Sequence, residues 1–304
     1  MKPEVRERVQ LVAKAVGYRP NRAARNLAGG RANIIGLVIE QSEMVKDPYG
    51  VSLIQWVAQA ADAHDEGLML IADSREPTDA VAKILADGLV DGVIISAVVA
   101  GVRWVEELMG ADIPCVLIGA HPRRTDVPVV DVENHDSARS IVGHLIDSGC
   151  RRVGTISGPL DRVDAVARLE GYRSAHQDRS MTVDEELIIE GDFARPTGYR
   201  EAAKLIDAGV DAIFCANDEM ALGAIHRARE ADLLLPEDLS IAGFDGMAFP
   251  IVDLARVTSA VQPFEELAEA AVRTLIGLIE GASEADDHII TPKIVFGDTT
   301  WPPS

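Results

Sequence analysis

Residues 210–215 read Val-Asp-Ala-Ile-Phe-Cys, and residues 90–95 read Val-Asp-Gly-Val-Ile-Ile. Each stretch is a short apolar run that begins with Val-Asp, and the two occupy equivalent places in the two halves of the chain. Short apolar runs of this length are typical of buried strands in parallel sheets. The repetition suggests two similar lobes, although two matching segments do not prove a duplication.

The same alternation of apolar runs and amphipathic stretches extends through the rest of the chain. Strands that alternate with helices are typical of βαβ units around a parallel sheet, so we predict an α/β protein with two similar, doubly wound, parallel-sheet lobes. In the first half the predicted strands are 34–40, 68–72, 92–96 and 115–118, and the predicted helices are 53–66 and 79–86. In the second half the predicted strands are 152–157, 187–190, 212–215 and 240–243, and the predicted helices are 137–148, 168–177, 197–208 and 220–230.

Length and composition bound the class of protein. With 304 residues and 47% hydrophobic content, the chain can bury a large core. Cys115, Cys150 and Cys215 have no zinc or disulfide spacing, so we expect core cysteines in a reducing compartment. No apolar segment follows the N-terminal charges, and no window approaches 18 uninterrupted apolar residues, which argues against secretion and membrane insertion. We therefore expect a cytoplasmic protein.

Charge is divided unequally along the chain. The net charge is -20, yet residues 1–31 hold eight Lys and Arg against two Glu; this segment carries +6 and leaves -26 on the other residues. A cationic N-terminus on an acidic body fits a protein whose head contacts DNA phosphates while its body stays off the duplex. If charge alone is considered, the alternative is that residues 1–31 are a solvated basic terminus with no DNA contact.

Residues 17–36 connect this basic segment to the first predicted strand. They read Gly-Tyr-Arg-Pro-Asn-Arg-Ala-Ala-Arg-Asn-Leu-Ala-Gly-Gly-Arg-Ala-Asn-Ile-Ile-Gly. Pro20 favours a helix start and Gly29-Gly30 a helix end, so we predict a short hinge helix over 21–28. Such a helix is marginal in water and should form only against a partner helix or a nucleic acid.

Polar and aromatic side chains follow the predicted strands, and ligand sites of such folds lie at the carboxyl ends of parallel strands. In two facing lobes these side chains would gather in the crevice between the lobes. Hydroxyl groups both donate and accept hydrogen bonds, and an apolar sugar face packs on an aromatic ring, so this set suits a polyhydroxylated ligand. The candidate effector-binding residues are Tyr49, Arg162, Asp164, Arg168, Phe193, Asn217 and Asp245.

Two of these positions, and Asp218 next to Asn217, have a purely structural alternative. Asp218 fits the N-cap of the helix that follows, which makes Asn217 the better ligand candidate. Asp245 could be a turn residue in Phe-Asp-Gly. Arg168 could pair with an acidic neighbour on its own helix.

The usual enzyme and cofactor motifs are missing from the sequence. It has no Walker A pattern, no Gly-x-Gly-x-x-Gly turn after the first strand, no His-Glu-x-x-His and no Gly-x-Ser-x-Gly. The segment 154–158, Gly-Thr-Ile-Ser-Gly, has the wrong spacing for the last of these motifs. We therefore expect no enzyme activity, no cofactor and no metal site.

The motifs of this chain, taken in series, closely resemble those of LacI-type transcriptional regulators over almost the whole length. Besides residues 17–36, the segments in the family's order are 130–134 (Val-Asp-Val-Glu-Asn), 158–159 (Gly-Pro), 168–172 (Arg-Leu-Glu-Gly-Tyr), 217–223 (Asn-Asp-Glu-Met-Ala-Leu-Gly), 235–240 (Leu-Pro-Glu-Asp-Leu-Ser), 243–245 (Gly-Phe-Asp) and 261–263 (Val-Gln-Pro). The resemblance implies a homodimer with operator DNA as its partner and a two-lobed core similar to periplasmic sugar-binding proteins.

The resemblance also implies roles for the candidate residues. Arg168, Asn217 and Asp245 would bind effector hydroxyls. Phe193 and Tyr49 would be stacking surfaces, whereas Arg162 and Asp164 would read the identity of the ligand. In the hinge, Leu27 would wedge into the minor groove beside its dimer mate, with Tyr18 and Asn21 near phosphates. The predicted DNA-binding hinge residues are Tyr18, Asn21, Arg22, Ala24 and Leu27.

Two features depart from the family pattern. The sequence opens with Lys-Pro-Glu-Val-Arg-Glu-Arg-Val at 2–9, which matches only the last helix of the family's DNA-binding headpiece. Without a recognition helix we expect weak DNA binding with no useful sequence preference. The loop 42–47 is also longer than the family usually has before its Pro-aromatic pair.

These patterns predict a repressor that senses a small carbohydrate between its lobes. Effector binding would favour one lobe orientation and so order or melt the paired hinge helices. One alternative is a regulator that senses a purine or another metabolite, because Arg162 and Asp164 can read a purine edge. Another is a solute-binding protein without a DNA function.

The predicted domain boundaries follow from this scheme. Residues 1–32 would be a headpiece remnant with the hinge helix, and 33–304 the effector-binding and dimerisation domain. The predicted N-lobe comprises 33–131 and 262–288, and the predicted C-lobe comprises 132–261 and 289–304. Apolar faces around 53–57 and 267–278 are predicted to form the dimer contact.

Overall fold

The computed structural model describes residues 31–40, 48–73, 84, 87–96, 113–120, 127–247, 256–283 and 285–303, with isolated positions at 5, 8, 12 and 15. The predicted hinge helix over 21–28 lies outside the described residues, as does almost all of the predicted helix over 79–86. The five hinge residues Tyr18, Asn21, Arg22, Ala24 and Leu27 also lie outside them.

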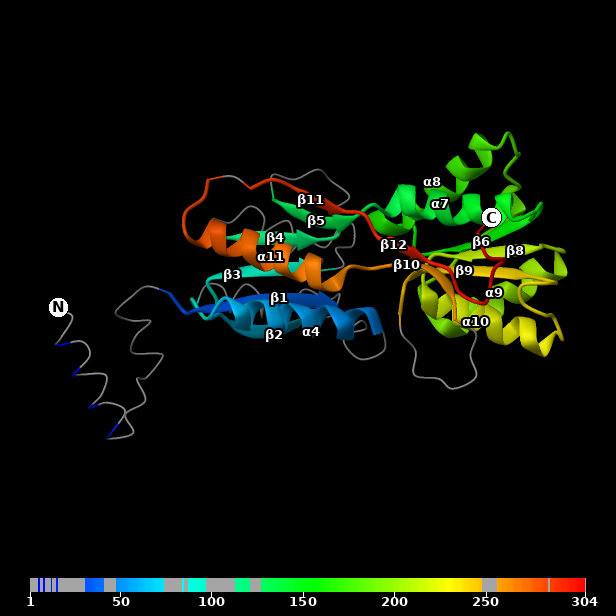
Figure 1. Cartoon of the computed structure of the whole chain (residues 1–304). Coiled ribbons are helices and arrows are strands. Elements are labelled where there is room, and N and C mark those ends of the chain that lie inside the picture. The colour runs from blue at the N-terminus through cyan, green and yellow to red at the C-terminus, as the bar shows by residue number, and fades with distance from the viewer. Residues whose placement is uncertain are drawn as a thin grey trace.

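Two six-stranded sheets form two lobes that lie end to end (Figure 1). The N-lobe sheet contains β1 (Ile34–Glu40), β2 (Gly67–Asp73), β3 (Gly92–Ser96), β4 (Cys115–Ile118), β5 (Val129–Val132) and β11 (His288–Ile290), in the order β11-β5-β4-β3-β1-β2. The C-lobe sheet contains β6 (Val153–Ser157), β7 (Ile188–Glu190), β8 (Ala212–Cys215), β9 (Ser240–Asp245), β10 (Thr258–Val261) and β12 (Lys293–Val295), in the order β12-β10-β9-β8-β6-β7. Neighbouring strands are parallel, except that β12 runs antiparallel to β10. The predicted α/β class with two parallel-sheet lobes is confirmed.

Helices cover these sheets. On the N-lobe, α4 (Pro48–Ala63) and α11 (Phe264–Ile279) pack against each other and against one face of the sheet. On the C-lobe, α7 (Asn134–Asp147) and α8 (Val163–Asp178) form one pair, and α9 (Arg195–Asp207) and α10 (Asp218–Glu230) form the other (Figure 1). A short 3-10 turn over Glu185–Leu187 precedes β7.

The structure corrects the predicted element bounds in a consistent direction. Helices α4, α7 and α8 begin at 48, 134 and 163, three to five residues before the predicted starts at 53, 137 and 168. The first large apolar side chain buried in α4 is Leu53 and in α8 it is Leu169, so apolar periodicity detects these helices only after their first turn. Strands β5, β10, β11 and β12 were not predicted, because each has only three or four residues, and β5, β11 and β12 are at most half-buried along their length.

The chain crosses between the lobes three times: from β5 to α7, from β10 to α11, and from β11 to β12. The first two crossings lie close to the predicted boundaries at 131/132 and 261/262. The third predicted boundary, 288/289, cuts through β11; the chain instead crosses after Ile290. Neither lobe is therefore a continuous stretch of sequence.

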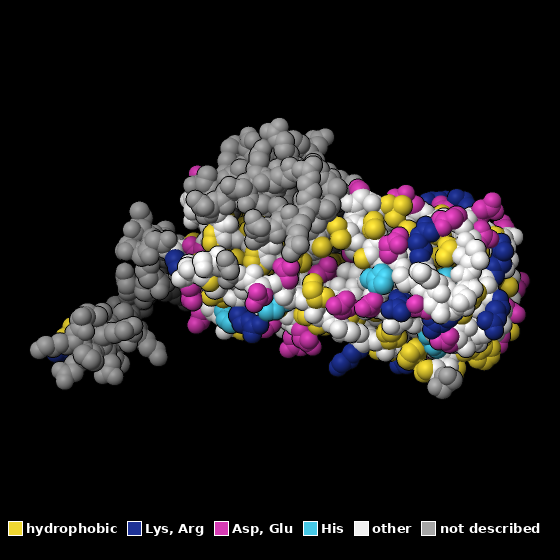
Figure 2. Space-filling view, turned by 90° about the horizontal axis from the view of Figure 1, so that it is seen from above, with side chains coloured by type: hydrophobic (Ala, Val, Ile, Leu, Met, Phe, Trp, Pro, Cys, Tyr) yellow, Lys and Arg dark blue, Asp and Glu magenta, His cyan; other side chains and the backbone are white. Residues whose placement is uncertain are grey.

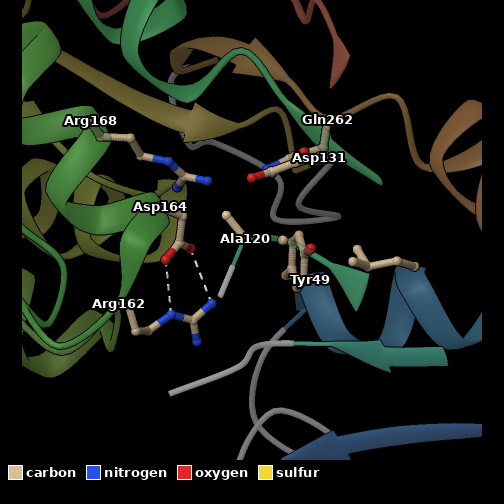
Figure 3. Close-up of a pocket in the computed structure, with 9 residues that line it drawn as sticks. Tyr49, Ala120, Asp131, Arg162, Asp164, Arg168 and Gln262 are labelled. Atoms are coloured by element: carbon tan, nitrogen blue, oxygen red, sulfur yellow. Dashed lines mark hydrogen bonds and ion pairs between the residues drawn. The ribbon is translucent and has the colours of Figure 1, made fainter. Parts of the chain in front are cut away.

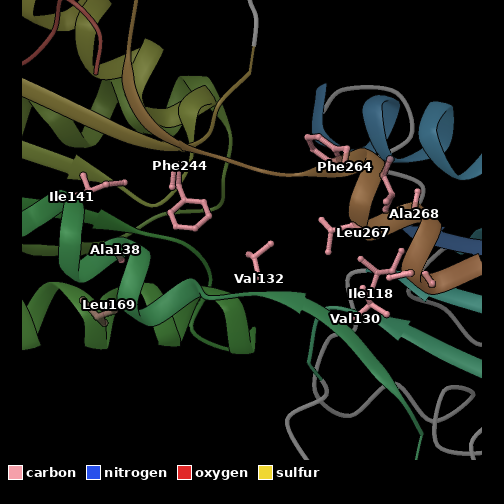
Figure 4. Close-up of a cluster of buried hydrophobic side chains, with 14 of the residues drawn as sticks. Ile118, Val130, Val132, Ala138, Ile141, Leu169, Phe244, Phe264, Leu267 and Ala268 are labelled. Atoms are coloured by element: carbon pink, nitrogen blue, oxygen red, sulfur yellow. The ribbon is translucent and has the colours of Figure 1, made fainter. Parts of the chain in front are cut away.

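One apolar cluster extends through both lobes at these crossings. Figure 4 shows Val132 between Phe244 of the C-lobe and Leu267 of the N-lobe, and all three belong to a single set of buried contacts. A second cluster fills the space between the C-lobe sheet and the α9–α10 pair. Cys115, Cys150 and Cys215 are buried and unpaired, as predicted.

The predicted dimer faces at 53–57 and 267–278 are divided between core and surface. Leu53, Val57 and Leu267 are each at most 1% exposed, because they pack into the core of their own lobe. Ile54 and Leu278 on the same two helices are partly exposed. The buried members cannot supply an intersubunit contact, so the dimer contact stays a prediction.

Charged side chains of both signs cover the face seen in Figure 2, where they are interspersed over the C-lobe at the right of the view. Surface ion pairs of the C-lobe include Arg139 with Asp178 and Arg179 with Asp147. Mixed surface charge of this kind favours solvation, and single exposed pairs contribute little to stability. None of the helices in the described part of the chain is long and apolar enough to cross a membrane.

Candidate functional site

All seven predicted effector-binding residues line one cavity between the lobes. Tyr49, the second residue of α4, comes from the N-lobe, and its ring lies 5.2 Å from that of Phe264. The other six come from the loops and helix starts that follow C-lobe strands, namely Arg162, Asp164, Arg168, Phe193, Asn217 and Asp245. The carboxyl ends of the strands therefore bring these residues together, as expected for this class of fold.

Arg168 is a buried cation that connects three C-lobe elements. Its side chain is 5% exposed, and its guanidinium carbon lies 3.8 Å from the ring centroid of Phe244. Nε donates to Oδ1 of Asn134 at 2.9 Å and Nη1 to the carbonyl of Ala216 at 2.6 Å, while Nη1 lies 3.5 Å from Oδ1 of Asp245. Arg168 therefore contacts α7, β9 and the end of β8, so pairing on its own helix does not explain it.

Asp245, the last residue of β9, is held in an unusual backbone conformation. Its φ is +107°, a left-handed value that costs a non-glycine residue energy and persists only where the surroundings enforce it. Oδ1 also accepts from Nε2 of Gln262 at 3.3 Å. Strain of this kind clusters at ligand sites, which favours a ligand contact over the turn alternative for Asp245.

Asp218 supports the loop behind Asp245. Its Oδ1 accepts from Oγ of Ser259 at 2.8 Å, and its Oδ2 accepts from the backbone N–H of Met247 at 2.8 Å. Burial, together with the nearby Asp245 carboxylate, raises the pKa of Asp218 well above its usual value. Asp218 is thus a structural residue that fixes the turn after β9.

The N-cap of α10 is Asn217, not Asp218 as predicted. Oδ1 of Asn217 accepts from the N–H of Met220 at 2.9 Å, and its Nδ2 donates to the carbonyl of Phe193 at 2.9 Å. The side-chain amide of Asn217 therefore both caps α10 and lines the cavity. The error of one residue arose because Asn and Asp are almost equally good caps.

Arg162 and Asp164 pair with each other at the start of α8. Nε and Nη2 of Arg162 each lie 3.1 Å from an oxygen of Asp164, and the guanidinium lies 5.2 Å from the ring centroid of Phe193. Burial alone would raise the pKa of Asp164, but Arg162 and Arg168 outweigh it and lower the pKa. The Phe193 ring lies so close to Gly158 that a Cβ there would be 2.2 Å from it, so this stacking position requires glycine.

A second cavity next to the first is lined by two polar side chains that were not among the candidates, Asp131 and Gln262 (Figure 3). Asp131 lies in β5 and Gln262 just after β10, where the chain crosses between the lobes. Both occur in segments that resemble the family, but β5 and β10 were not predicted. Without those strands, neither residue could be assigned to a strand end.

Asp131 is a carboxylate with an unusual protonation equilibrium. Its Oδ1 accepts from the N–H of Val132 at 2.7 Å and from Nδ2 of Asn134 at 3.1 Å. Burial raises its pKa to about 6, with Asp164 adding to the increase and Arg168 opposing it. Near neutral pH, the protein thus keeps a costly negative charge between its lobes.

The two cavities are small, about 30 and 20 Å³ in volume. Such spaces hold one or two water-sized molecules, whereas ligand pockets are typically several hundred Å³. A monosaccharide therefore requires the lobes to separate before it can enter. A larger groove of about 320 Å³ lies beyond Gln262, between Trp56, Phe264 and Lys293, but it has fewer converging polar groups than the cleft.

The chemistry of the cleft is that of binding. Within the described residues, no three His, Cys, Asp or Glu side chains gather as a metal site. The polar groups of the cleft instead make fixed hydrogen bonds to one another across several elements. Such an arrangement can orient a polar ligand between the two lobes.

Comparisons with known proteins agree with this architecture. Residues 142–300 match the model of a periplasmic binding protein-like domain. The chain is 32% identical to the HTH-type transcriptional regulator CelR of Thermobifida fusca over 287 residues, 92% of this chain and 84% of CelR. It is 30% identical to the HTH-type transcriptional repressor PurR of Proteus mirabilis over 299 residues, 95% of this chain and 86% of PurR.

Solved structures show the same relationship. A transcriptional regulator CelR–cellobiose complex matches with a TM-score of 0.81 at 29% identity, covering 98% of this chain and 91% of that one. A regulatory protein of the LacI family from Chloroflexus aggregans matches with a TM-score of 0.79 at 25% identity, covering 88% and 99% of the two chains.

The fold and the cleft thus define a two-lobed binding protein of the periplasmic-binding-protein type. Its relatives are transcriptional regulators, not enzymes, which confirms the expectation that the chain is not an enzyme. This chain belongs to the LacI family of transcriptional regulators.

Proposed function

We propose that this regulator senses a small carbohydrate in the cleft between its lobes. The observation that carries the proposal is the convergence of seven side chains on one interlobe cavity: Tyr49, Arg162, Asp164, Arg168, Phe193, Asn217 and Asp245. Carboxylate, guanidinium and amide groups meet the donors and acceptors of sugar hydroxyls, and Phe193 and Tyr49 offer rings for a sugar face. That the related CelR forms a complex with cellobiose supports this ligand class.

Binding would act by shifting a population. A sugar that contacts Tyr49 of the N-lobe and Arg168 and Asp245 of the C-lobe favours the closed orientation, because only that orientation makes both sets of contacts. We propose that this movement changes the pairing of the basic hinge, where Tyr18, Asn21, Arg22, Ala24 and Leu27 would contact operator DNA. Residues 33–304 would form the effector-binding and dimerisation domain, acting in the cytoplasm, where operator DNA is.

A purine effector is the alternative, favoured by a donor–acceptor pair that could read a purine edge. The pair is Arg162 and Asp164. Nε and Nη2 of Arg162 donate hydrogen bonds to the two carboxylate oxygens of Asp164. A pair engaged in this way has less capacity to read a base edge, so the carbohydrate proposal is better supported.

A panel of sugars should identify the ligand class by thermal shift. We expect at least one uncharged mono- or disaccharide to stabilise the protein by about 2.7 kcal/mol at a hundredfold excess over its Kd. Asp245→Ala should abolish this shift, each variant being compared with its own melting temperature without sugar. Asp192→Ala, outside the cavity on the loop before α9, is the control and should keep the shift. Stabilisation by nucleobases alone would overturn the carbohydrate proposal.

We also propose a homodimer that uses exposed apolar residues of the N-lobe. Val51 on α4 is 53% exposed and Leu70 on the neighbouring β2 is 39% exposed. Replacing both with glutamate should convert a dimer at micromolar concentration into a monomer in light scattering, because charges would be buried unpaired. Leu234→Glu is the control, since Leu234 is 64% exposed on the C-lobe. A wild-type monomer would contradict the proposal.

A further inference from the structure

Asp131 has one carboxylate oxygen fully engaged and one directed at the cleft. Oδ1 accepts two hydrogen bonds, from Val132 and Asn134, whereas no hydrogen bond from the described residues reaches Oδ2. Figure 3 shows Asp131 beside Gln262 on one side of the cavity, with Arg168 and Asp164 on the other. An oxygen that can still accept a hydrogen bond thus lies at the end of the cleft where the chain crosses between the lobes.

Gln262 adds a second acceptor at the same place. Its Nε2 faces Asp245 at 3.3 Å, and this contact fixes the amide orientation because a carboxylate can only accept. The amide oxygen of Gln262 is therefore the atom left for a ligand. Two neighbouring acceptors require a ligand that donates, as a hydroxyl does and a phosphate dianion does not.

The charges around the two cavities leave one carboxylate in excess. The two cations, Arg162 and Arg168, are matched by Asp164 at 3.1 Å and Asp245 at 3.5 Å. Asp131 is the third carboxylate, so among the described residues the charged groups that line the cavities sum to -1. Like charges repel strongly where water is largely excluded, so a further anion would be unfavourable at this end of the cleft.

We infer that the end of the cleft next to the chain crossings selects an uncharged ligand. Asp131 is the residue that accepts a hydrogen bond from one of the ligand's hydroxyl groups. This inference rests on the proposed function, because it narrows the carbohydrate class to sugars without phosphate or carboxylate groups. Asp131 acts in two ways: its Oδ2 binds a hydroxyl through a charge-assisted hydrogen bond, and its surplus charge excludes anionic sugars. Selection by repulsion is a common source of specificity.

The test compares uncharged sugars with their own phosphate esters by isothermal titration calorimetry at pH 7.5. The probes are glucose, galactose, ribose and cellobiose, with glucose 6-phosphate, galactose 6-phosphate, ribose 5-phosphate and cellobiose 6-phosphate. We expect at least one uncharged sugar to bind and its phosphate ester to bind at least tenfold more weakly. In Asp131→Asn the uncharged sugar should bind at least fivefold more weakly, and the discrimination against the ester should shrink.

The variant preserves the local structure, since the Oδ1 of asparagine can still accept from Val132. The control is Asp207→Asn, which makes the same charge change at the exposed end of α9 and should bind like the wild type. If neither sugars nor esters bind, the proposed function fails and this inference fails with it. If the esters bind as well as the sugars, or if Asp131→Asn binds and discriminates like the wild type, the carbohydrate proposal stands and only this inference is overturned.

Discussion

Replacing Arg168 with methionine should lower the free energy of unfolding by about 3–5 kcal/mol, the usual cost of breaking a buried ion pair from one side. The change leaves the buried Asp245 without its cation and removes the donors to Asn134 and Ala216. Methionine keeps an apolar stem near Phe244, so most of the loss would come from the stranded polar groups.

Urea denaturation at pH 7.5 measures this loss against a matched surface arginine. Arg139 on α7 also pairs with an aspartate, but its side chain is 45% exposed, so Arg139→Met should change the free energy of unfolding far less than Arg168→Met. In the double variant Arg168→Met/Asp245→Asn, removal of both charges should restore part of the stability. Equal losses in Arg168→Met and Arg139→Met would show that the buried network contributes nothing beyond a surface pair.

Asp131→Asn should have the opposite effect and stabilise the protein at pH 7.5. Burial holds the pKa of Asp131 at about 6 in the folded protein, against an ordinary value of 3.8. That difference corresponds to an upper limit of about 3 kcal/mol by which the charged form penalises folding. Asparagine has no charge to bury, so the variant escapes the penalty while it keeps an acceptor for the Val132 N–H.

The pH dependence of this gain has a defined sign. Between about pH 4 and 6 the folded protein binds a proton at Asp131 that the unfolded chain does not, so this group adds stability as the pH falls. The gain in unfolding free energy of Asp131→Asn over the wild type should therefore reach its full size above pH 6 and vanish towards pH 4. The measurement is the difference in unfolding free energy between the two proteins, because other carboxylates such as Asp164 shift the opposite way. A variant that is less stable at pH 7.5, or a gain independent of pH, would contradict the assigned cause.

The sheets were largely predictable, because strands β1, β3, β4 and β8 are short apolar runs with nearly complete burial. Helix starts were less predictable, since the large buried side chains that produce apolar periodicity come after the first turn of α4 and α8. The short strands at the crossings were not predictable at all. In β10, Thr258 is buried through hydrogen bonds to Thr299 and Thr300, which lie some 40 residues further on, and no local pattern reveals such partners.

The candidate site was predictable to the extent that its residues directly follow strands. Residues such as Asn217 and Asp245 could be nominated because β8 and β9 were recognised. Asp131 and Gln262 were missed because their position at the cleft depends on β5 and β10. The dimer faces were harder to predict, because an apolar helix face has the same pattern whether it covers its own sheet or another subunit.

The three crossings between the lobes also determine when each lobe can be completed during protein synthesis. The N-lobe begins with β1 at Ile34, yet it lacks α11 and its edge strand β11 until Ile290 has been made. The C-lobe begins later and is complete only when Thr299 and Thr300, which bond to β9 and β10, have been made. Domains generally fold as units in the order in which they leave the ribosome, but here the unit that starts first cannot finish before most of the second has been translated. Nascent chains of this protein should therefore expose apolar N-lobe surface for most of their synthesis, which makes the N-lobe the natural substrate for chaperones.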